Sequence, residues 1–384
     1  MHTFIKNLLN GQAVEWRTLG EVVLPTNNIK WHESDLSYRY IDLSSVDKDN
    51  NNIGETLEIT SKNAPSRAQK IVKKDDIIFA TTRPTQMRSA LIPPNLDGQI
   101  ASTGYCILRA NQNEVLPKWI YYNLQINEFK IYLQDKQSGT AYPAISDGLI
   151  KQFQIPIPPL SVQSQIVQIL DAFTELNDQL TTELSMRQKQ YQYYRDFLLS
   201  EHELAKVGFE WKTLGKLGII NRGKRVVKSQ LTTEGVYPVY QNSLQPLGYF
   251  DKSNVKANTT FMITAGAAGE IGYSNCAFWS ADDCYYFDCP KDVLDDRFLY
   301  HSLKKQQNKI FSQVRKASIP RLGRNSVENI KIPIPPLSVQ NQIVAILDKF
   351  DHLTSSITDG LPKEIELRRK QYEHYRELLL GFDN

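Results

Sequence analysis

Basic side chains, interleaved with hydroxyl and amide side chains, gather in two separate stretches of this chain. In the first stretch, five cations and no acid lie between residues 62 and 74. The candidate binding residues of this first stretch are Lys62, Arg67, Arg83, Gln86, Arg88, Ser138 and Thr140. Those of the second stretch are Arg222, Lys224, Arg225, Gln241, Asn242, Arg315, Lys316, Ser318 and Arg321.

These residue types are the ones that bind nucleic acid. Lysine and arginine neutralise phosphates, and this attraction supplies most of the non-specific affinity for DNA. Arginine, asparagine and glutamine read base edges through paired hydrogen bonds. A single cluster of this kind could equally be a solvated face. Both stretches place their clusters in corresponding positions, however, which favours a shared binding role.

Catalytic and cofactor motifs are incomplete in this chain. The run from Gly218 to Arg225 nearly matches the phosphate-binding loop G-x-x-x-x-G-K-[ST], but the last position is arginine, so the magnesium-binding hydroxyl is missing. We expect a strand and a turn with exposed cations there. Gly266, Gly269 and Gly272 do not form the dinucleotide fingerprint and predict a hairpin or bulge. No Asn/Asp-Pro-Pro-aromatic or H-E-x-x-H motif occurs, so we expect no catalytic site in this chain.

The overall composition is that of a globular protein with a local binding footprint. The 384 residues suffice for two to three domains, and the net charge of +3 is mild. No apolar run approaches the ~20 residues of a membrane span. The four cysteines form no C-x-x-C pair, so we expect free thiols, no metal site and a cytoplasmic protein.

The elements that must position the two stretches are duplicated. Residues 155–176 read IPIPPLSVQSQIVQILDAFTEL, and residues 332–353 read IPIPPLSVQNQIVAILDKFDHL, with 17 of 22 positions identical. A second block follows each copy, and residues 187–199 match residues 368–380 at eight of 13 positions. The halves also begin alike, with E-W-[RK]-T-L-G after residues 14 and 209. A repeat of this length indicates a duplicated half-molecule, because solenoid repeats reach only about 50 residues.

Each duplicated connector predicts an extended entry and a long helix. The prolines of I-P-I-P-P lack donors and favour extended neighbours, and Ser161 is a candidate helix cap. Apolar residues then recur every three or four positions from Ile166 to Leu184, which predicts a helix of about 40 residues with one apolar seam. So long a helix needs a partner. We expect the two copies to pair antiparallel, with Ile169 and Leu176 facing Ile346 and Leu353 or their neighbours along the seam.

The variable regions mix strands, turns and helices. Residues 77–82 and 103–110 predict strands, whereas residues 116–133 and 298–311 predict helices. We therefore expect an α+β protein with two duplicated α/β domains separated by two long helices. The expected segments are 1–154 (a short helix and the first domain), 155–208 (connector and helix), 209–331 (second domain) and 332–384 (connector and helix).

These motifs together resemble the specificity subunits of type I restriction–modification enzymes. The resemblance rests on the paired P-I-P-P-L-S-V-Q connectors, the E-W-[RK]-T-L-G openings, D-D-I-I-F-A-T-T-R-P at residues 75–84 and S-G-T-A-Y-P-A-I-S at residues 138–146. It implies two target-recognition domains, each reading one half of a split DNA target. It also implies that the two helices form an antiparallel coiled coil, which sets the spacing and docks two modification subunits.

The same resemblance implies that catalysis lies on other chains. The partners would be double-stranded DNA, two modification (methyltransferase) subunits and restriction (translocase and endonuclease) subunits. S-adenosylmethionine, ATP and magnesium would belong to those subunits, so this chain would carry no cofactor and would not be an enzyme. The alternative is a coiled-coil scaffold that no longer reads DNA, and salt-dependent binding of duplex DNA would separate the two functions.

The second copy of the connector departs from the first. The interval from Leu353 to Arg368 is four residues longer than that from Leu176 to Arg187 and contains Gly360 and Pro362. Proline removes a helix donor and glycine weakens a helix. We expect the second helix to be broken or kinked there.

Overall fold

The chain divides by its internal contacts into two units, each built around one variable region. The computed structural model describes residues 2–47, 50–356 and 359–382. Unit 1 comprises Met1–Gln179 with Glu366–Asn384, and unit 2 comprises Leu180–Ile365. Each long helical region therefore contributes residues to both units.

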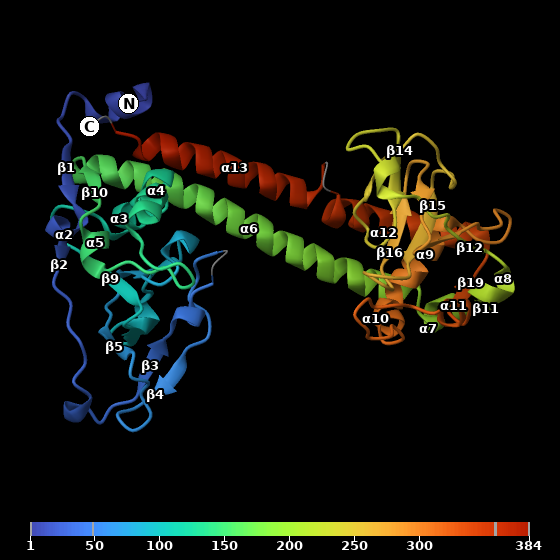
Figure 1. Cartoon of the computed structure of the whole chain (residues 1–384), viewed down its shortest axis with the longest axis horizontal. Helices are drawn as coiled ribbons and strands as arrows, with labels where there is room; N and C mark the ends of the chain where they lie inside the picture. The colour runs from blue at the N-terminus through green and yellow to red at the C-terminus, as the bar shows by residue number, and fades with distance from the viewer. Residues whose placement is uncertain (1, 48–49, 357–358, 383–384) are drawn as a thin grey trace. The chain divides into compact units, whose positions relative to one another are not determined.

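Unit 1 carries the expected mixture of short strands and helices (Figure 1). Its strands are β1 (Glu15–Thr18), β2 (Val23–Leu24), β3 (Tyr38–Ile41), β4 (Leu57–Ile59), β5 (Ala68–Ile71), β6 (Ile77–Ala80), β7 (Ser89–Leu91), β8 (Ile100–Ser102), β9 (Tyr105–Ala110) and β10 (Gln154–Ile157). Its helices are α1 (Thr3–Leu9), α2 (Leu19–Val22), α3 (Pro117–Asn123), α4 (Asn127–Lys136), α5 (Asp147–Lys151) and the first part of α6 (Leu160–Leu198).

Unit 2 repeats this plan with different residues. Its strands are β11 (Glu210–Thr213), β12 (Ile220–Arg222), β13 (Tyr237–Tyr240), β14 (Gly248–Phe250), β15 (Thr259–Ile263), β16 (Ile271–Ser274), β17 (Trp279–Ser280), β18 (Cys284–Phe287) and β19 (Lys331–Ile334). Its helices are α7 (Glu201–Ala205), α8 (Leu214–Leu217), α9 (Asp296–Lys305), α10 (Gln307–Phe311), α11 (Arg324–Glu328) and α12 (Leu337–Ser355), and α13 (Leu361–Leu380) begins here.

The sheets of the two units correspond. In unit 1 the strand orders are β2-β9-β6-β7 and β4-β3-β8-β5, and in unit 2 they are β12-β18-β15-β16 and β14-β13-β17. Neighbouring strands are antiparallel except for β3 with β8 and β13 with β17, which are parallel. The α+β class and the duplicated domains expected from the sequence are confirmed.

A two-stranded sheet joins the opening of each half to its connector. β1 pairs with β10 so that Trp16 lies opposite Pro156, and β11 pairs with β19 so that Trp211 lies opposite Pro333. The E-W-[RK]-T-L-G and P-I-P-P motifs of one half are thus partners across this sheet. The connector prolines are tolerated because each sheet has only two strands, and every strand is an edge.

The long helix and its antiparallel pairing with the second copy are confirmed, but its cap differs from expectation. α6 has 39 residues and begins at Leu160, so Ser161 lies inside the first turn and is not the cap. In unit 1, the first part of α6 lies beside α13, which runs in the opposite direction (Figure 1). Phe173 of α6 stacks on Tyr375 of α13, with ring centroids 5.3 Å apart.

The second part of α6 has a different partner. In unit 2, Tyr194 of α6 stacks on Phe350 of α12, with ring centroids also 5.3 Å apart. These stacked pairs join the two copies antiparallel, as expected, but in another register, so the expected facing of Ile169 with Ile346 is wrong. Ile169 packs against the core of unit 1, whereas the side chain of Ile346 in unit 2 is 42% exposed. Leu176 and Leu353, the other expected pair, likewise belong to different units.

The second connector helix is broken where the sequence predicts it. α12 ends at Ser355 and α13 begins at Leu361. Gly360 permits this junction, because a Cβ there would lie 2.8 Å from the carbonyl oxygens of His352 and Ser356. Pro362 lies in the first turn of α13, where a missing N–H costs nothing.

Other local predictions are mostly confirmed. β6 and β9 lie where strands were expected, and Gly266 and Gly269 form the turn between β15 and β16. The helices predicted over residues 116–133 and 298–311 are each split in two, into α3 and α4 and into α9 and α10. The four cysteines are free. Within the described ranges, no helix is long and apolar enough to cross a membrane.

Candidate nucleic-acid interface

In unit 1, the loop after β6 lies against the segment that leads to α5. The β6–β7 loop spans residues 81–88, and the second segment spans residues 137–146. Ile145 N–H donates to Thr81 O at 2.9 Å, and Arg83 N–H donates to Pro143 O at 2.7 Å. We call these two segments the paired loops of unit 1. They unite the motifs D-D-I-I-F-A-T-T-R-P and S-G-T-A-Y-P-A-I-S, which are far apart in the sequence.

Unit 2 has paired loops of its own, formed by residues 264–270 and 312–323. Leu322 N–H donates to Thr264 O at 2.8 Å, and Gly266 N–H donates to Pro320 O at 3.1 Å. The same bonds thus recur at corresponding positions, with Gly266 in the place of Arg83 and Pro320 in the place of Pro143. A further bridge also recurs, between Ser138 and Ala144 in unit 1 and between Arg315 and Arg321 in unit 2.

Most candidate residues of the first stretch lie on the paired loops of unit 1. These are Arg83, Gln86, Arg88, Ser138 and Thr140, and all except Arg88 are exposed. Arg88 is half-buried, and its Nη1 donates to Leu43 O at 2.7 Å. Part of its role is therefore to hold the turn after β3 against the β6–β7 loop.

The cations that precede β6 differ in exposure and in role. Arg67 is exposed, and its carbonyl accepts the Thr103 N–H at 2.8 Å, next to Gly104, whose carbonyl accepts the Thr81 N–H at 2.8 Å. Arg67 therefore adjoins the paired loops. Lys62 is exposed in the turn after β4. Lys70 is structural, because its Nζ donates to Asp147 Oδ2 and to a backbone carbonyl at 2.6 Å.

In unit 2, the paired loops carry Arg315, Lys316, Ser318 and Arg321, and all four are exposed. Asn242 adjoins them, because its carbonyl accepts the Ala267 N–H at 2.9 Å, and Gln241 precedes it at the end of β13. The fit here is close, since a Cβ on Gly266 would lie 2.8 Å from that carbonyl.

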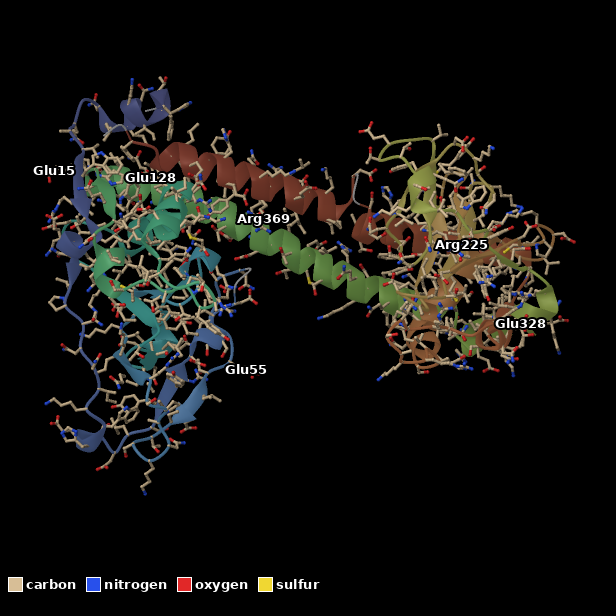
Figure 2. All side chains as sticks on the ribbon, in the orientation of Figure 1. Glu15, Glu55, Glu128, Arg225, Glu328 and Arg369 are labelled. Carbon is tan, nitrogen blue, oxygen red and sulfur yellow. The ribbon has the colours of Figure 1, made fainter. Side chains whose placement is uncertain are left out.

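The three remaining candidates lie beside these loops on and after β12. Arg222 Nε donates to Asp282 O at 3.2 Å, and the neighbouring Asp283 O accepts the Thr264 N–H at 2.8 Å. Lys224 and Arg225 follow and are exposed; Arg225 is labelled in Figure 2. This segment is a strand and a turn with exposed cations, as predicted from its incomplete phosphate-binding motif.

Two left-handed positions shape the turn in each unit. Arg83 and Met87 have φ of 51° and 55°, and the corresponding Gly266 and Gly269 have φ of 81° and 90°. Glycine adopts this conformation freely, whereas a residue with a Cβ pays roughly 1–2 kcal/mol for it. Unit 1 therefore holds an arginine at a position where glycine would be the relaxed choice.

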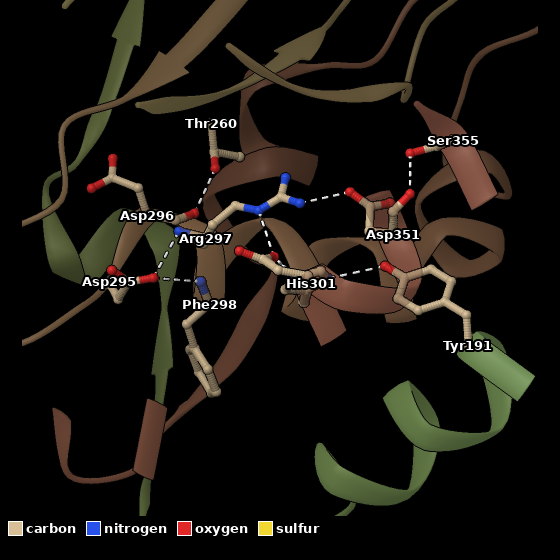
Figure 3. A network of polar contacts seen from close by, with 10 residues as sticks. Tyr191, Thr260, Asp295, Asp296, Arg297, Phe298, His301, Asp351 and Ser355 are labelled. Carbon is tan, nitrogen blue, oxygen red and sulfur yellow. Dashed lines mark hydrogen bonds and ion pairs between the residues drawn. The ribbon is translucent and has the colours of Figure 1, made fainter. Parts of the chain in front are cut away.

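A polar network mounts the second domain on the helices of unit 2 (Figure 3). Arg297 of α9 donates from Nε to Asp348 Oδ1 at 2.8 Å and from Nη2 to Asp351 Oδ2 at 2.6 Å. His301 Nε2 lies 2.7 Å from the same oxygen of Asp348, and its Nδ1 lies 3.0 Å from the Tyr191 hydroxyl of α6. Because a carboxylate only accepts, Nε2–H donates to Asp348 and Nδ1 accepts from Tyr191.

Burial, hydrogen bonds and neighbouring charges together set the protonation of this network. The His301 side chain is fully buried, and this burial, with the positive charge of Arg297, lowers its pKa although the bond to Asp348 opposes the shift. The pKa of Asp348 is also lowered. Burial raises it, but the His301 hydrogen bond and the Arg297 charge outweigh burial. The network therefore holds a neutral histidine beside an ionised aspartate.

Unit 1 mounts its domain at the corresponding place with other side chains. Lys118 Nζ donates to Asp171 Oδ2 at 2.7 Å, and the Tyr122 hydroxyl donates to Asp171 Oδ1 at 2.6 Å. A buried glutamine completes each mounting. Gln163 Oε1 accepts the Leu116 N–H, and Gln340 Oε1 accepts the Asp295 N–H, both at 2.9 Å.

The two halves match one family of known sequences. The type I restriction modification DNA specificity domain matches residues 14–186 and again residues 206–367. This chain belongs to that family. The repeated match covers both units and explains why their sheets and mountings correspond.

Full-length relatives of this type I specificity family span the whole chain. A putative type I restriction enzyme specificity subunit of Haemophilus influenzae is 31% identical, over 99% of this chain and 98% of that protein. The EcoR124I/EcoR124II specificity subunit of Escherichia coli is also 31% identical, over 99% and 97%.

Solved structures share the fold. The S subunit of a type I restriction–modification system from M. genitalium has a TM-score of 0.65 at 18% identity and covers 98% of both chains. A structure described as the basis of complex assembly in a type I system has a TM-score of 0.61 at 24% identity, over 97% of this chain and 99% of that one.

Tyr142, on the paired loops of unit 1, was not among the binding residues predicted from the sequence. Tyr142 lies in S-G-T-A-Y-P-A-I-S, is 72% exposed and has its ring 5.4 Å from the Arg83 guanidinium carbon. Its proximity to Pro143, which is shared with the second half as Pro320, was the available signal. The loop pairing that places it over Arg83 could not be read from either segment alone.

Proposed function

We propose that this chain is the DNA-reading, non-catalytic subunit of a type I restriction–modification complex. One observation carries the proposal: the two units share the same backbone bonds in their paired loops but present different side chains on them. A common scaffold with different exposed donors suits two domains that each read their own half of a split DNA target.

The long helices suit a spacer and a docking site. α6 contributes residues 160–179 to unit 1 and residues 180–198 to unit 2, so one helix is shared by both readers. In the proposed complex the helices set the gap between the half-sites and dock two modification subunits, which restriction subunits join. S-adenosylmethionine, ATP and magnesium would act on those partner subunits, and this chain would bind DNA without a cofactor.

Methylation mapping tests the proposal. A host expressing this chain with its modification subunit should methylate adenines in one split sequence, and a host expressing the modification subunit alone should not. The assembled complex should bind duplex DNA carrying that sequence, with an affinity that falls steeply as salt rises because bound lysines and arginines release counterions. A complex that assembles but neither binds duplex DNA nor methylates it would instead indicate a scaffold that no longer reads DNA.

A further inference from the structure

The paired loops of the two units differ in which loop carries the positive charges. We call the member of each pair that joins two strands, residues 81–88 or 264–270, the strand loop. On the strand loop, unit 1 has Arg83 and Arg88, whereas the corresponding residues of unit 2 are Gly266 and Glu270. On the other loop the order is reversed. Unit 2 has Arg315, Lys316 and Arg321, whereas unit 1 has Ser138, Gly139 and Ala144 at the matching positions. The backbone scaffold is the same, but the cations lie on opposite loops.

Arg83 has a strained backbone conformation at a position where the same backbone bond in unit 2 is made by glycine. Its φ of 51° is left-handed, and glycine occupies this position in unit 2. Its side chain is exposed, and no ion pair holds it among the residues that the structure describes. Strained backbone positions of this kind concentrate at functional sites.

The side-chain environment of Arg83 suits recognition of a base. The guanidinium lies over the ring of Tyr142, which is itself 72% exposed, so the pair faces solvent together. Stacking on an aromatic ring limits the rotamers of an arginine and leaves its donor edge free. A preorganised arginine can donate two hydrogen bonds to guanine O6 and N7, which is the commonest specific contact in the major groove.

We propose that the two half-sites are read from opposite loops: by Arg83, stacked on Tyr142, in unit 1, and by Arg315 and Lys316 in unit 2. Arg83 recognises a guanine of the first half-site. This inference rests on the proposed function and adds to it the identity of the reading residues. In unit 2, Gly266 occupies the position that corresponds to Arg83 and has no side chain. The cations of unit 2 therefore act from the other paired loop.

The test is Arg83→Gly in the full chain, assembled with its modification subunit. Glycine relaxes the left-handed turn, so the unfolding midpoint should stay equal or rise. Discrimination at one guanine of the first half-site should fall by about 5- to 150-fold in competition binding, the range of one bidentate base contact. Methylation mapping should show that position relaxed and the second half-site unchanged.

Asp75→Gly is the matched control. Asp75 also has a left-handed φ, of 68°, but precedes β6, whereas Arg83 follows it. In this variant too the unfolding midpoint should stay equal or rise, and the methylated sequence should be unchanged. Arg315→Ser introduces the residue of unit 1 and should relax the second half-site only.

Three results would overturn the assignment. Arg83→Gly could weaken binding to all sequences alike, which would make Arg83 a phosphate contact. It could leave specificity intact, which would exclude any reading role. The native complex could methylate no split sequence, in which case the proposed function fails and this inference with it; specific methylation by the native complex separates the first two results from the third.

Discussion

Phe173 stacks on Tyr375, with ring centroids 5.3 Å apart and ring planes at 20°. Phe350 stacks on Tyr194 in unit 2 at the same distance, with planes at 19°. Each pair joins a phenylalanine of the first duplicated block to a tyrosine of the second block, taken from the other copy. The helical seam is therefore built twice from the same two kinds of segment.

Removing either ring should weaken its own unit. Phe173→Ala and Phe350→Ala should each lower the free energy of unfolding by about 2 kcal/mol, because a half-buried ring loses apolar burial and its stacking partner. Urea unfolding measures the change. Gln165→Ala, at an exposed position of the same helix, is the control and should stay within about 0.5 kcal/mol of the native protein.

Replacing the buried Gln163 should lower the free energy of unfolding more than replacing an exposed glutamine. Its Nε2 donates to Glu114 O and Pro158 O, and its Oε1 accepts the Leu116 N–H. Gln163→Ala leaves these three groups without their side-chain partner, so we expect a loss of about 3 kcal/mol or more in thermal or urea unfolding. Gln340→Ala should do the same in unit 2. A loss near that of Gln165→Ala would contradict the bracing role.

The His301 network predicts a pH dependence near neutrality. Since burial lowers the pKa of His301, the unfolded chain binds a proton more readily than the folded chain. The stability is fully present above the unfolded pKa of about 6.5 and is lost as pH falls from there through the folded pKa. Asp348 contributes only at lower pH, because its pKa lies below the usual 3.8.

Replacing this histidine should flatten the profile. His301→Gln keeps a donor for Asp348 but does not titrate, so it should be less stable at pH 8 and lose less stability between pH 7 and pH 5. Urea midpoints across this range provide the measurement. Equal slopes for native and variant proteins would show that His301 is not the titrating group.

Lengthening α6 should change the gap between the half-sites. Four residues inserted near Thr181 add roughly 6 Å of helix, close to two base pairs of spacer. The insertion also rotates one reader, so part of the activity should be lost. Methylation mapping gives the new spacing, and an equal insertion between Gln112 and Asn113, in an exposed turn, should leave it unchanged. Unchanged spacing in an active α6 variant would refute the spacer role.

Exchanging one variable region should change one half-site. Replacing residues 15–150 by the equivalent region of a relative should alter the first half of the methylated sequence, because the reading residues of unit 2 are untouched. The readout is again methylation mapping with the modification subunit. A change in both half-sites would contradict independent reading by the two domains.

The sequence by itself determined the local features of this protein. The duplicated connectors predicted α6 and the paired organisation, and Gly360 with Pro362 predicted the break between α12 and α13. Short apolar runs located β6 and β9. Such features follow from neighbouring residues, because backbone conformation depends on nearby sterics and on which face is apolar.

Only the tertiary structure decided which segments meet. The duplicated apolar seam predicted that the two copies pair but not in which register, so the sequence could not tell that Phe173 stacks on Tyr375 in unit 1. Likewise, Arg83 and Tyr142 are 59 residues apart in the sequence, and backbone bonds between two loops bring them together. Those bonds depend on how strands and helices pack at long range, which neither segment encodes alone.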